Sequence, residues 1–114
     1  MIYTKDLENL VLKRHLLNNA SELLILGGFI GPSPVSKIAK ETINSKIIYG
    51  CKVQASFNET FDKQYKFYSK NSNTEVFYKK SYNHSKIYCW HDNGNVIEII
   101  AGSANFSNNG LTND

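Results

Sequence analysis

The sequence contains few cysteines, few prolines and no long apolar run. Its two cysteines, Cys51 and Cys89, form no C-x-x-C pair, so the sequence predicts buried, reduced thiols instead of a disulfide or a zinc site. No stretch approaches the roughly 18 apolar residues that indicate a membrane span. The opening segment MIYTKDLENL also lacks the apolar centre of a signal peptide. We therefore expect a soluble, cytoplasmic protein.

The composition is typical of an ordinary folded domain. Of the 114 residues, 41% are apolar and 20% are charged, which argues against a disordered or repetitive chain. The length predicts a single domain over residues 1–114 with modest stability, so partner subunits are expected. The formal net charge of +3 permits a nucleic-acid partner without requiring one.

Helical and strand-like patterns alternate along most of the chain. Apolar residues at helical spacing predict a helix over residues 4–20, and capping residues begin two more helices near residues 33 and 56. Short apolar runs predict strands at 23–26, 46–50, 74–78, 85–90 and 95–102. This order predicts an α/β fold whose mixed sheet has helices on both faces, a parallel start and an antiparallel hairpin at its end.

Two features of these elements have a simple structural interpretation. The glycines at 27, 28 and 31 match no phosphate-loop motif, so they indicate a strand-to-helix turn. The third predicted helix carries an aromatic stripe, and such a stripe packs in a core more often than it stacks on bases. The rings of this stripe are Phe57, Phe61, Tyr65 and Tyr68.

An Asn-Gly dipeptide at residues 93–94 separates the last two strands. A two-residue turn there pairs Asp92 with Asn95 and fixes the register of the hairpin. In that register His84 lies opposite Ser103, Lys86 lies opposite Ala101, and Asn105 follows Ser103 by two. The four polar residues His84, Lys86, Ser103 and Asn105 are therefore expected to share one face.

The same register predicts a hairpin that is largely buried on both faces. Tyr88, Trp90, Ile97 and Ile99 would lie on the face of the polar residues, and Ile87, Cys89, Val96 and Ile100 on the other. A metal site built from Cys89, His91 and Asp92 is the less favoured alternative, because neighbouring strand residues alternate between faces.

The four polar residues suit the chemistry of a phosphodiester. A buried ammonium such as that of Lys86 calls for an anion, and a phosphate fits. The Asn105 amide and the Ser103 hydroxyl can donate hydrogen bonds to phosphate oxygens. His84 can attack phosphorus or carry a proton near neutral pH.

These residues also carry a family resemblance. The segments HSKIY and GSANFS resemble the H-x-K and G-S-x-N halves of the phospholipase D superfamily signature. With ELLILGGFIGPSPVSKIAKE upstream and AGSANFSNNGL at the end, the chain is similar to the catalytic domain of NgoFVII-like and BfiI-like restriction endonucleases. The resemblance implies a phospholipase-D-like fold and a metal-independent endonuclease that needs no cofactor and cleaves DNA.

The resemblance also implies a role for each site residue. His84 would form a phosphohistidine intermediate, Lys86 and Asn105 would hold the non-bridging oxygens, and Ser103 would support this cradle. The reaction needs a second histidine to protonate the leaving oxygen, but the chain has one motif copy. A homodimer that brings two His84 side chains together is therefore expected.

The sequence departs from the family pattern in two places. The signature usually has Asp five positions after the lysine, where this chain has His91, followed by Asp92. The chain also ends at Asp114, before the strand whose glutamate orients the histidine in these nucleases, so the resemblance implies a C-terminally truncated domain.

Two alternatives to the endonuclease remain. The first is a non-enzymatic remnant of a restriction endonuclease that keeps the fold and weak phosphate or DNA binding. The second is a lipid-directed phosphodiesterase of the same superfamily, which is less favoured because such chains normally carry two motif copies.

Overall fold

The computed structural model describes residues 7–27, 30–50, 55–79 and 86–102. These residues form an α/β domain with one mixed sheet. Its elements are α1 (Leu7–Lys13), α2 (His15–Asn18), β1 (Glu22–Gly27), α3 (Pro32–Ala39), β2 (Asn44–Tyr49), α4 (Ala55–Asn71), β3 (Thr74–Tyr78), β4 (Ile87–Asp92) and β5 (Asn95–Ala101).

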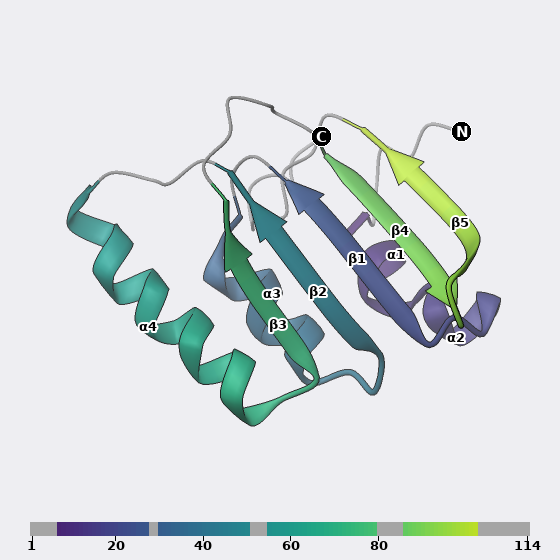
Figure 1. The fold of residues 1–114 in the computed structure, drawn as a ribbon, viewed down its shortest axis with the longest axis horizontal. Coiled ribbons are helices and arrows are strands. Elements are labelled where there is room, and N and C mark those ends of the chain that lie inside the picture. Colours follow the sequence, from purple (N-terminus) through teal and green to yellow (C-terminus); the bar gives the residue numbers. More distant parts are fainter. Residues whose placement is uncertain (1–6, 28–29, 51–54, 80–85, 103–114) are drawn as a thin grey trace.

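The five strands lie in the order β3-β2-β1-β4-β5 (Figure 1). β1, β2 and β3 are parallel to one another, β4 is antiparallel to β1, and β5 is antiparallel to β4. The expected α/β fold, with a parallel start and an antiparallel hairpin at the end, is confirmed.

The first helical segment is shorter and more broken than the sequence predicts. Instead of one helix over residues 4–20, α1 ends at Lys13 and α2 begins at His15. Asn19 ends α2 in the left-handed conformation, with φ of 60°, which asparagine adopts more readily than most residues. The side-chain oxygen of Asn18 accepts a hydrogen bond from the backbone N–H of Ala20 at 2.9 Å, just before the chain enters β1.

The core lies on one face of the sheet. Leu23, Ile25, Ile47 and Trp90 alternate with more exposed residues along their strands and are almost completely buried. Residues at alternate positions of a strand face the same side, so these side chains form one apolar layer. On α4, Tyr65 is buried and Phe61 and Tyr68 pack against this layer, which confirms the core interpretation for these three rings.

The helices in the described part of the chain all pack on this core face. They do not form the second helical layer that the sequence predicts on the opposite face. α3 connects β1 to β2, and α4 connects β2 to β3, one strand further in the same direction (Figure 1). Two crossovers of the same hand that step in the same direction place both helices on the same face. α1 and α2 lie behind the sheet with α3 (Figure 1).

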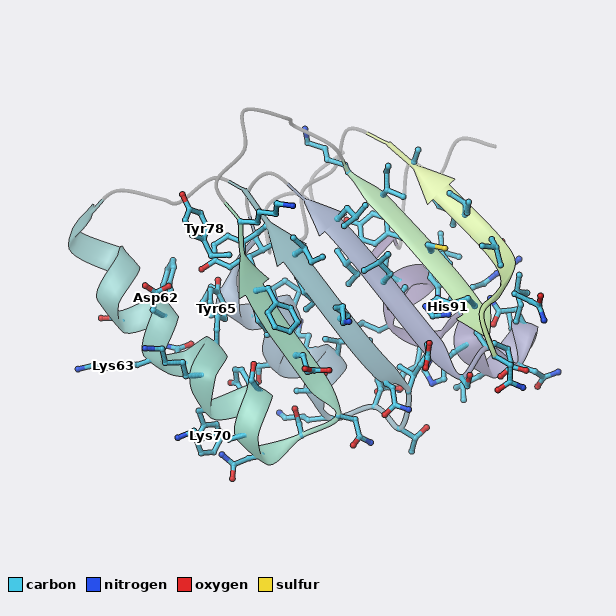
Figure 2. All side chains as sticks on the ribbon, viewed as in Figure 1. Asp62, Lys63, Tyr65, Lys70, Tyr78 and His91 are labelled. Carbon is cyan, nitrogen blue, oxygen red and sulfur yellow. The ribbon has the colours of Figure 1, made fainter. Side chains whose placement is uncertain are left out.

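The opposite face of the sheet faces the viewer in Figures 1 and 2. Apolar side chains alternate with Lys46, Glu75 and His91 on this open face. Phe77 of β3 is 44% exposed there. In the hairpin, Ile99 is 58% exposed on the same face, so the hairpin is not buried on both faces as expected.

The Asn-Gly turn is confirmed, but the register beyond it differs from the prediction. Asp92 pairs with Asn95, and the turn residues Asn93 and Gly94 have φ values of 50° and 81°, as a two-residue hairpin of this kind requires. A β-bulge then leaves Ile97 without a partner across the hairpin, because His91 pairs with Val96 and the preceding Trp90 pairs with Glu98.

The bulge shifts every later pair by one residue. Ala101 lies opposite Ile87 and not opposite Lys86, and Ile100 lies opposite Tyr88. The expectation that Ile97 and Ile99 share the face of Trp90 is therefore wrong, and Glu98 and Ile100 take those places.

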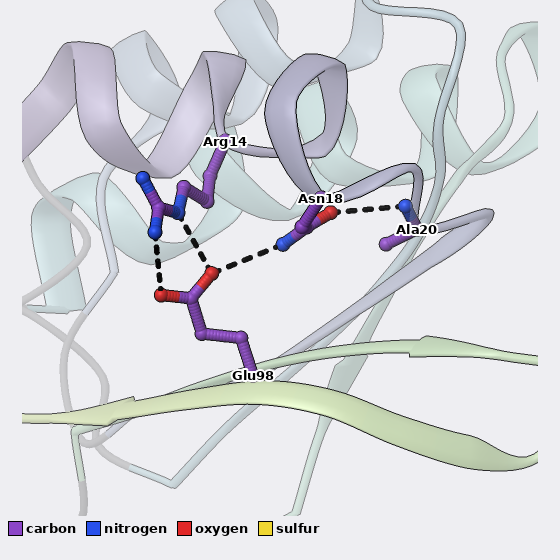
Figure 3. A network of polar contacts seen from close by, with 4 residues as sticks. All are labelled: Arg14, Asn18, Ala20 and Glu98. Atoms are coloured by element: carbon purple, nitrogen blue, oxygen red, sulfur yellow. Dashed lines mark hydrogen bonds and ion pairs between the residues drawn. The ribbon is translucent and has the colours of Figure 1, made fainter.

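A polar network anchors β5 to the N-terminal helices (Figure 3). Arg14 donates from Nε and Nη2 to the two carboxylate oxygens of Glu98, at 2.7 and 3.0 Å. Asn18 donates to the same carboxylate at 3.1 Å. These bonds connect residues 80 and 84 positions apart in the chain, and they become possible because the bulge turns Glu98 toward the core face.

Candidate functional site

The carboxyl ends of the three parallel strands form one edge of the sheet. Gly27, Tyr49 and Tyr78 end β1, β2 and β3, at the upper edge in Figure 1. Backbone bonds continue the pairing beyond this line, from Gly50 N to Gly27 O at 3.1 Å and from Lys79 N to Tyr49 O at 2.9 Å. Ligands of open α/β sheets bind at this edge, since the loops and helix N-termini converge there.

Lys86 lies at the same edge. β4 runs antiparallel to β1 and pairs Ile87 with Leu26, so the residue just before β4 lies beside the end of β1. Lys86 is half-buried. The structure thus brings the lysine of the H-x-K half to the edge where α/β folds bind ligands.

The two halves of the motif meet at this lysine. The backbone N–H of Gly102, the first residue of GSAN, donates to the carbonyl oxygen of Lys86 at 3.0 Å. Ser103 follows Gly102 directly in the chain. His84, Ser103 and Asn105 lie outside the described residues, so their shared face stays a prediction, and the shifted register no longer provides the argument for it.

A cluster of tyrosines, which no sequence motif predicts as a group, borders this edge. The Tyr49 ring lies 5.6 Å from that of Tyr65 and 5.2 Å from that of Tyr78. The Tyr49 hydroxyl donates to Asp62 Oδ1 at 3.1 Å. Burial, and then the Asp62 carboxylate, raise the pKa of Tyr49 and of Tyr65, so both phenols stay protonated and act as donors at neutral pH.

Sequence signals for this cluster exist but are weak. Tyr49 is the second-last residue of a predicted strand, Tyr78 is the last residue of another, and Tyr65 belongs to the aromatic stripe of α4. Their convergence depends on β2 and β3 being parallel neighbours and on α4 covering them, which no local pattern reveals.

The far edge of the sheet holds the aspartate that departs from the family pattern. Asp92 pairs with Asn95 beside the hairpin turn and accepts the Ser21 hydroxyl at 2.6 Å. It lies at the opposite end of β4 from Lys86. Among the described residues, no three or more His, Cys, Asp and Glu side chains are arranged to hold a metal ion. Cys89, His91 and Asp92 therefore form no such group.

A polar depression of about 610 Å³ lies at this far edge. In it, Glu22 Oε2 lies 2.9 Å from His91 Nδ1. Asn44, Lys46, Ser69, Ser72, Asn73 and Glu75 line it as well. Lys86 and Gly102, the described residues of the two motif halves, lie at the opposite edge, so this depression is not the candidate site.

Comparison with known proteins decides the family. The model of the family "NgoFVII restriction endonuclease N-terminal PLD domain" matches residues 5–114. The chain belongs to this family. The match to the NgoFVII-type PLD domain covers both motif halves and all the described strands. A search of curated proteins finds no match.

The helices in the described part of this NgoFVII-type domain are short or polar. Its longest helix, α4, has 17 residues and a strongly polar composition. No helix among the described residues is long and apolar enough to cross a membrane.

Proposed function

We propose that this chain is a metal-independent endonuclease domain that cleaves DNA phosphodiesters through a phosphohistidine intermediate. One observation carries the proposal: the family match over residues 5–114 includes both motif halves, and Lys86 and Gly102, one from each half, are bonded at the ligand-binding edge of the sheet. Restriction endonucleases act on DNA, so the family supplies the substrate class.

The chemistry proceeds by two displacements at phosphorus. A ring nitrogen of His84 forms a bond to phosphorus while the bond to the leaving oxygen breaks, and an acid gives that oxygen a proton. Water then attacks phosphorus, the phosphorus–nitrogen bond breaks, and the former acid accepts the proton of water. Lys86 and Asn105 stabilise the charge on the non-bridging oxygens in both steps, and Ser103 supports them.

The acid is supplied by a second subunit. His15 and His91, the other two histidines, lie outside the motif. His91 lies at the far edge of the sheet, and His15 is a buried residue of α2. A two-fold contact through the upper edge would bring two copies of His84 to one phosphate, with one as the nucleophile and the other as the acid.

Cleavage of duplex DNA in excess EDTA tests the proposal directly. We expect wild-type protein to cleave, and His84→Ala to lose at least about a thousandfold in rate, because removal of a nucleophile usually has an effect of this size. His91→Ala is the matched control, since it removes a histidine from the far edge of the same sheet. It should retain nearly full activity.

The outcomes separate the possible functions. If folded wild-type protein binds DNA but does not cleave it with or without metal ions, the non-enzymatic remnant is the correct interpretation. Cleavage that needs a metal ion would exclude the proposed mechanism. Sedimentation with and without sulfate tests the dimer, which should tighten with sulfate because the anion offsets the repulsion between two Lys86 side chains. A protein that stays monomeric at all concentrations while it cleaves would refute the shared site.

A further inference from the structure

Helix α2 places one side chain in the core, and that side chain can titrate. His15 is 6% exposed, whereas the next two residues, Leu16 and Leu17, are 63% and 75% exposed. Both ring nitrogens of His15 are buried and have no hydrogen-bond partner. The imidazole is therefore held in the core by packing alone, as an apolar ring would be.

The surroundings of His15 oppose its protonation. A charged imidazole has two N–H donors, and neither nitrogen has an acceptor here. Glu41 Oε1 lies 3.8 Å from Nε2, but Lys13 binds the other oxygen of this carboxylate at 2.8 Å. Among the described side chains, Glu41 and Lys13 are the charges that act on the ring, while the neighbouring Arg14 bonds Glu98. Burial outweighs the attraction of Glu41 and lowers the pKa of His15.

The same helical turn holds β5. Arg14 and Asn18, on either side of the buried histidine, donate three hydrogen bonds to Glu98 (Figure 3). β5 leads directly to Gly102, whose N–H bonds the carbonyl oxygen of Lys86 at 3.0 Å. If α2 moved out of the core, it would break the bonds to Glu98 and loosen the strand that brings the second motif half to Lys86.

We propose that α2 is an acid-released latch: neutral His15 keeps this helix closed on the core, and protonation of His15 opens it and frees β5. The site that the latch would regulate is that of the proposed function, but the latch itself needs no catalysis. Opening should begin as the pH falls below 6.5, because the open form then binds a proton that the closed form excludes. Glu98 stays ionised in this range, since the bonds from Arg14 hold its pKa below 4.5.

The expected effect follows from linkage between protonation and opening. If only the open form binds the proton, the ratio of open to closed molecules should rise about tenfold between about pH 7.5 and pH 5.5. A closed form that accepted the proton equally well would show no rise.

Amide hydrogen exchange of the free protein tests the latch, with each rate divided by that of an unfolded chain at the same pH. The amides of β5 and those of Asn18 and Asn19, which are bonded within this turn, should share one opening constant. It should exceed that of β2, which is paired on both sides, and rise about tenfold in acid.

Two variants remove the titrating group. His15→Phe keeps a ring in the core and should abolish the rise; should it not fold, His15→Gln serves the same purpose. The control is His91→Gln, which removes a histidine from the open face of the sheet and should keep the full rise.

Three results would overturn the proposal. Exchange of β5 at the rate of β2 would mean that β5 opens only when the whole domain unfolds. Opening in wild type that does not change with pH would mean that the closed form accepts the proton. A rise that persists in the folded His15 variant, or disappears in His91→Gln, would assign the titration to another group. Failure of the proposed catalysis leaves this measurement unaffected, because it is made without DNA.

Discussion

The bond between Glu98 and Arg14 is expected to be a main anchor of β5. This edge strand exposes Val96, Ile97 and Ile99, so it has little apolar surface of its own in the core. Arg14 donates two hydrogen bonds to the carboxylate, at 2.7 and 3.0 Å, and Asn18 donates a third at 3.1 Å. Because β5 leads directly to Gly102 at Lys86, its position also affects the candidate site.

Glu98→Gln removes the charge but keeps the size of the side chain. The amide still offers one oxygen, while its NH₂ group faces a guanidinium that can only donate. Hydrogen bonds to charged groups contribute about 1.5–3 kcal/mol each, and fully exposed ion pairs about 0.2–1 kcal/mol. The Arg14 and Glu98 side chains are 30% and 23% exposed. We therefore expect Glu98→Gln to lower the free energy of unfolding by about 2 kcal/mol, which is more than an exposed ion pair contributes and similar to one hydrogen bond to a charged group. This loss corresponds to about 8 °C in Tm.

The pH dependence gives this prediction a second, independent measurement. Hydrogen bonds from Arg14 hold the pKa of Glu98 below its ordinary value of 4.5, although partial burial acts in the opposite direction. Because its pKa is lower in the folded state, the ionised Glu98 stabilises the fold above pH 4.5, and this contribution is lost as the pH falls through the lowered pKa. The variant cannot titrate at this position, so its deficit relative to wild type should shrink in acid.

Urea unfolding followed by circular dichroism near neutral pH and near pH 3 measures both effects. Glu75→Gln is the matched control, because Glu75 is exposed on the open face of β3, and it should change stability by less than about 0.5 kcal/mol. The reasoning is refuted if Glu98→Gln loses no more than Glu75→Gln, or if its deficit is the same in acid as at neutral pH.

Three further predictions concern the site, the buried histidine and the turn. Lys86→Ala should abolish the rise in Tm that sulfate gives to wild type, while it changes stability without sulfate by less than about 1 kcal/mol; a large loss without sulfate would make Lys86 structural. Burial lowers the pKa of His15 from its ordinary 6.5, with Glu41 opposing, so this residue stabilises the fold above pH 6.5 and the contribution is lost as the pH falls below it. His15→Phe should therefore lose less unfolding free energy than wild type between about pH 7 and 5, and an equal loss would contradict the assignment. Gly94→Ala should destabilise by about 1 kcal/mol through its φ of +81° alone, since no atom lies within 4 Å of the added carbon, and Gly102→Ala, with equal space and no positive φ, should be nearly neutral in urea unfolding.

The sequence by itself determined the local elements and the family. Short apolar runs specify the five strands, because a strand that packs in a sheet needs apolar side chains over only a few residues. Asn93 and Gly94 specify the hairpin turn, because both must adopt positive φ. The H-x-K and G-S-x-N segments indicated the phospholipase D superfamily, and the family match over residues 5–114 confirms the NgoFVII-type domain.

Only the tertiary structure decided which residues meet across the hairpin. The apolar pattern of β5 is compatible with either register, since Ile97, Ile99 and Ile100 fall on both faces. The bulge at Ile97 places Glu98 where Arg14 and Asn18 can bond it, and these partners come from helices at the other end of the chain. No local pattern carries that information, because the stabilising contacts join residues 80 and 84 positions apart in sequence.

The tertiary structure also decided which face of the sheet the helices cover. Strand and helix patterns do not reveal that β2 and β3 follow β1 in one direction, and this order is what places α3 and α4 on the same face. It also brings Tyr49, Tyr65 and Tyr78 together. Contacts of this kind depend on the packing of whole elements, which sequence periodicity specifies only one element at a time.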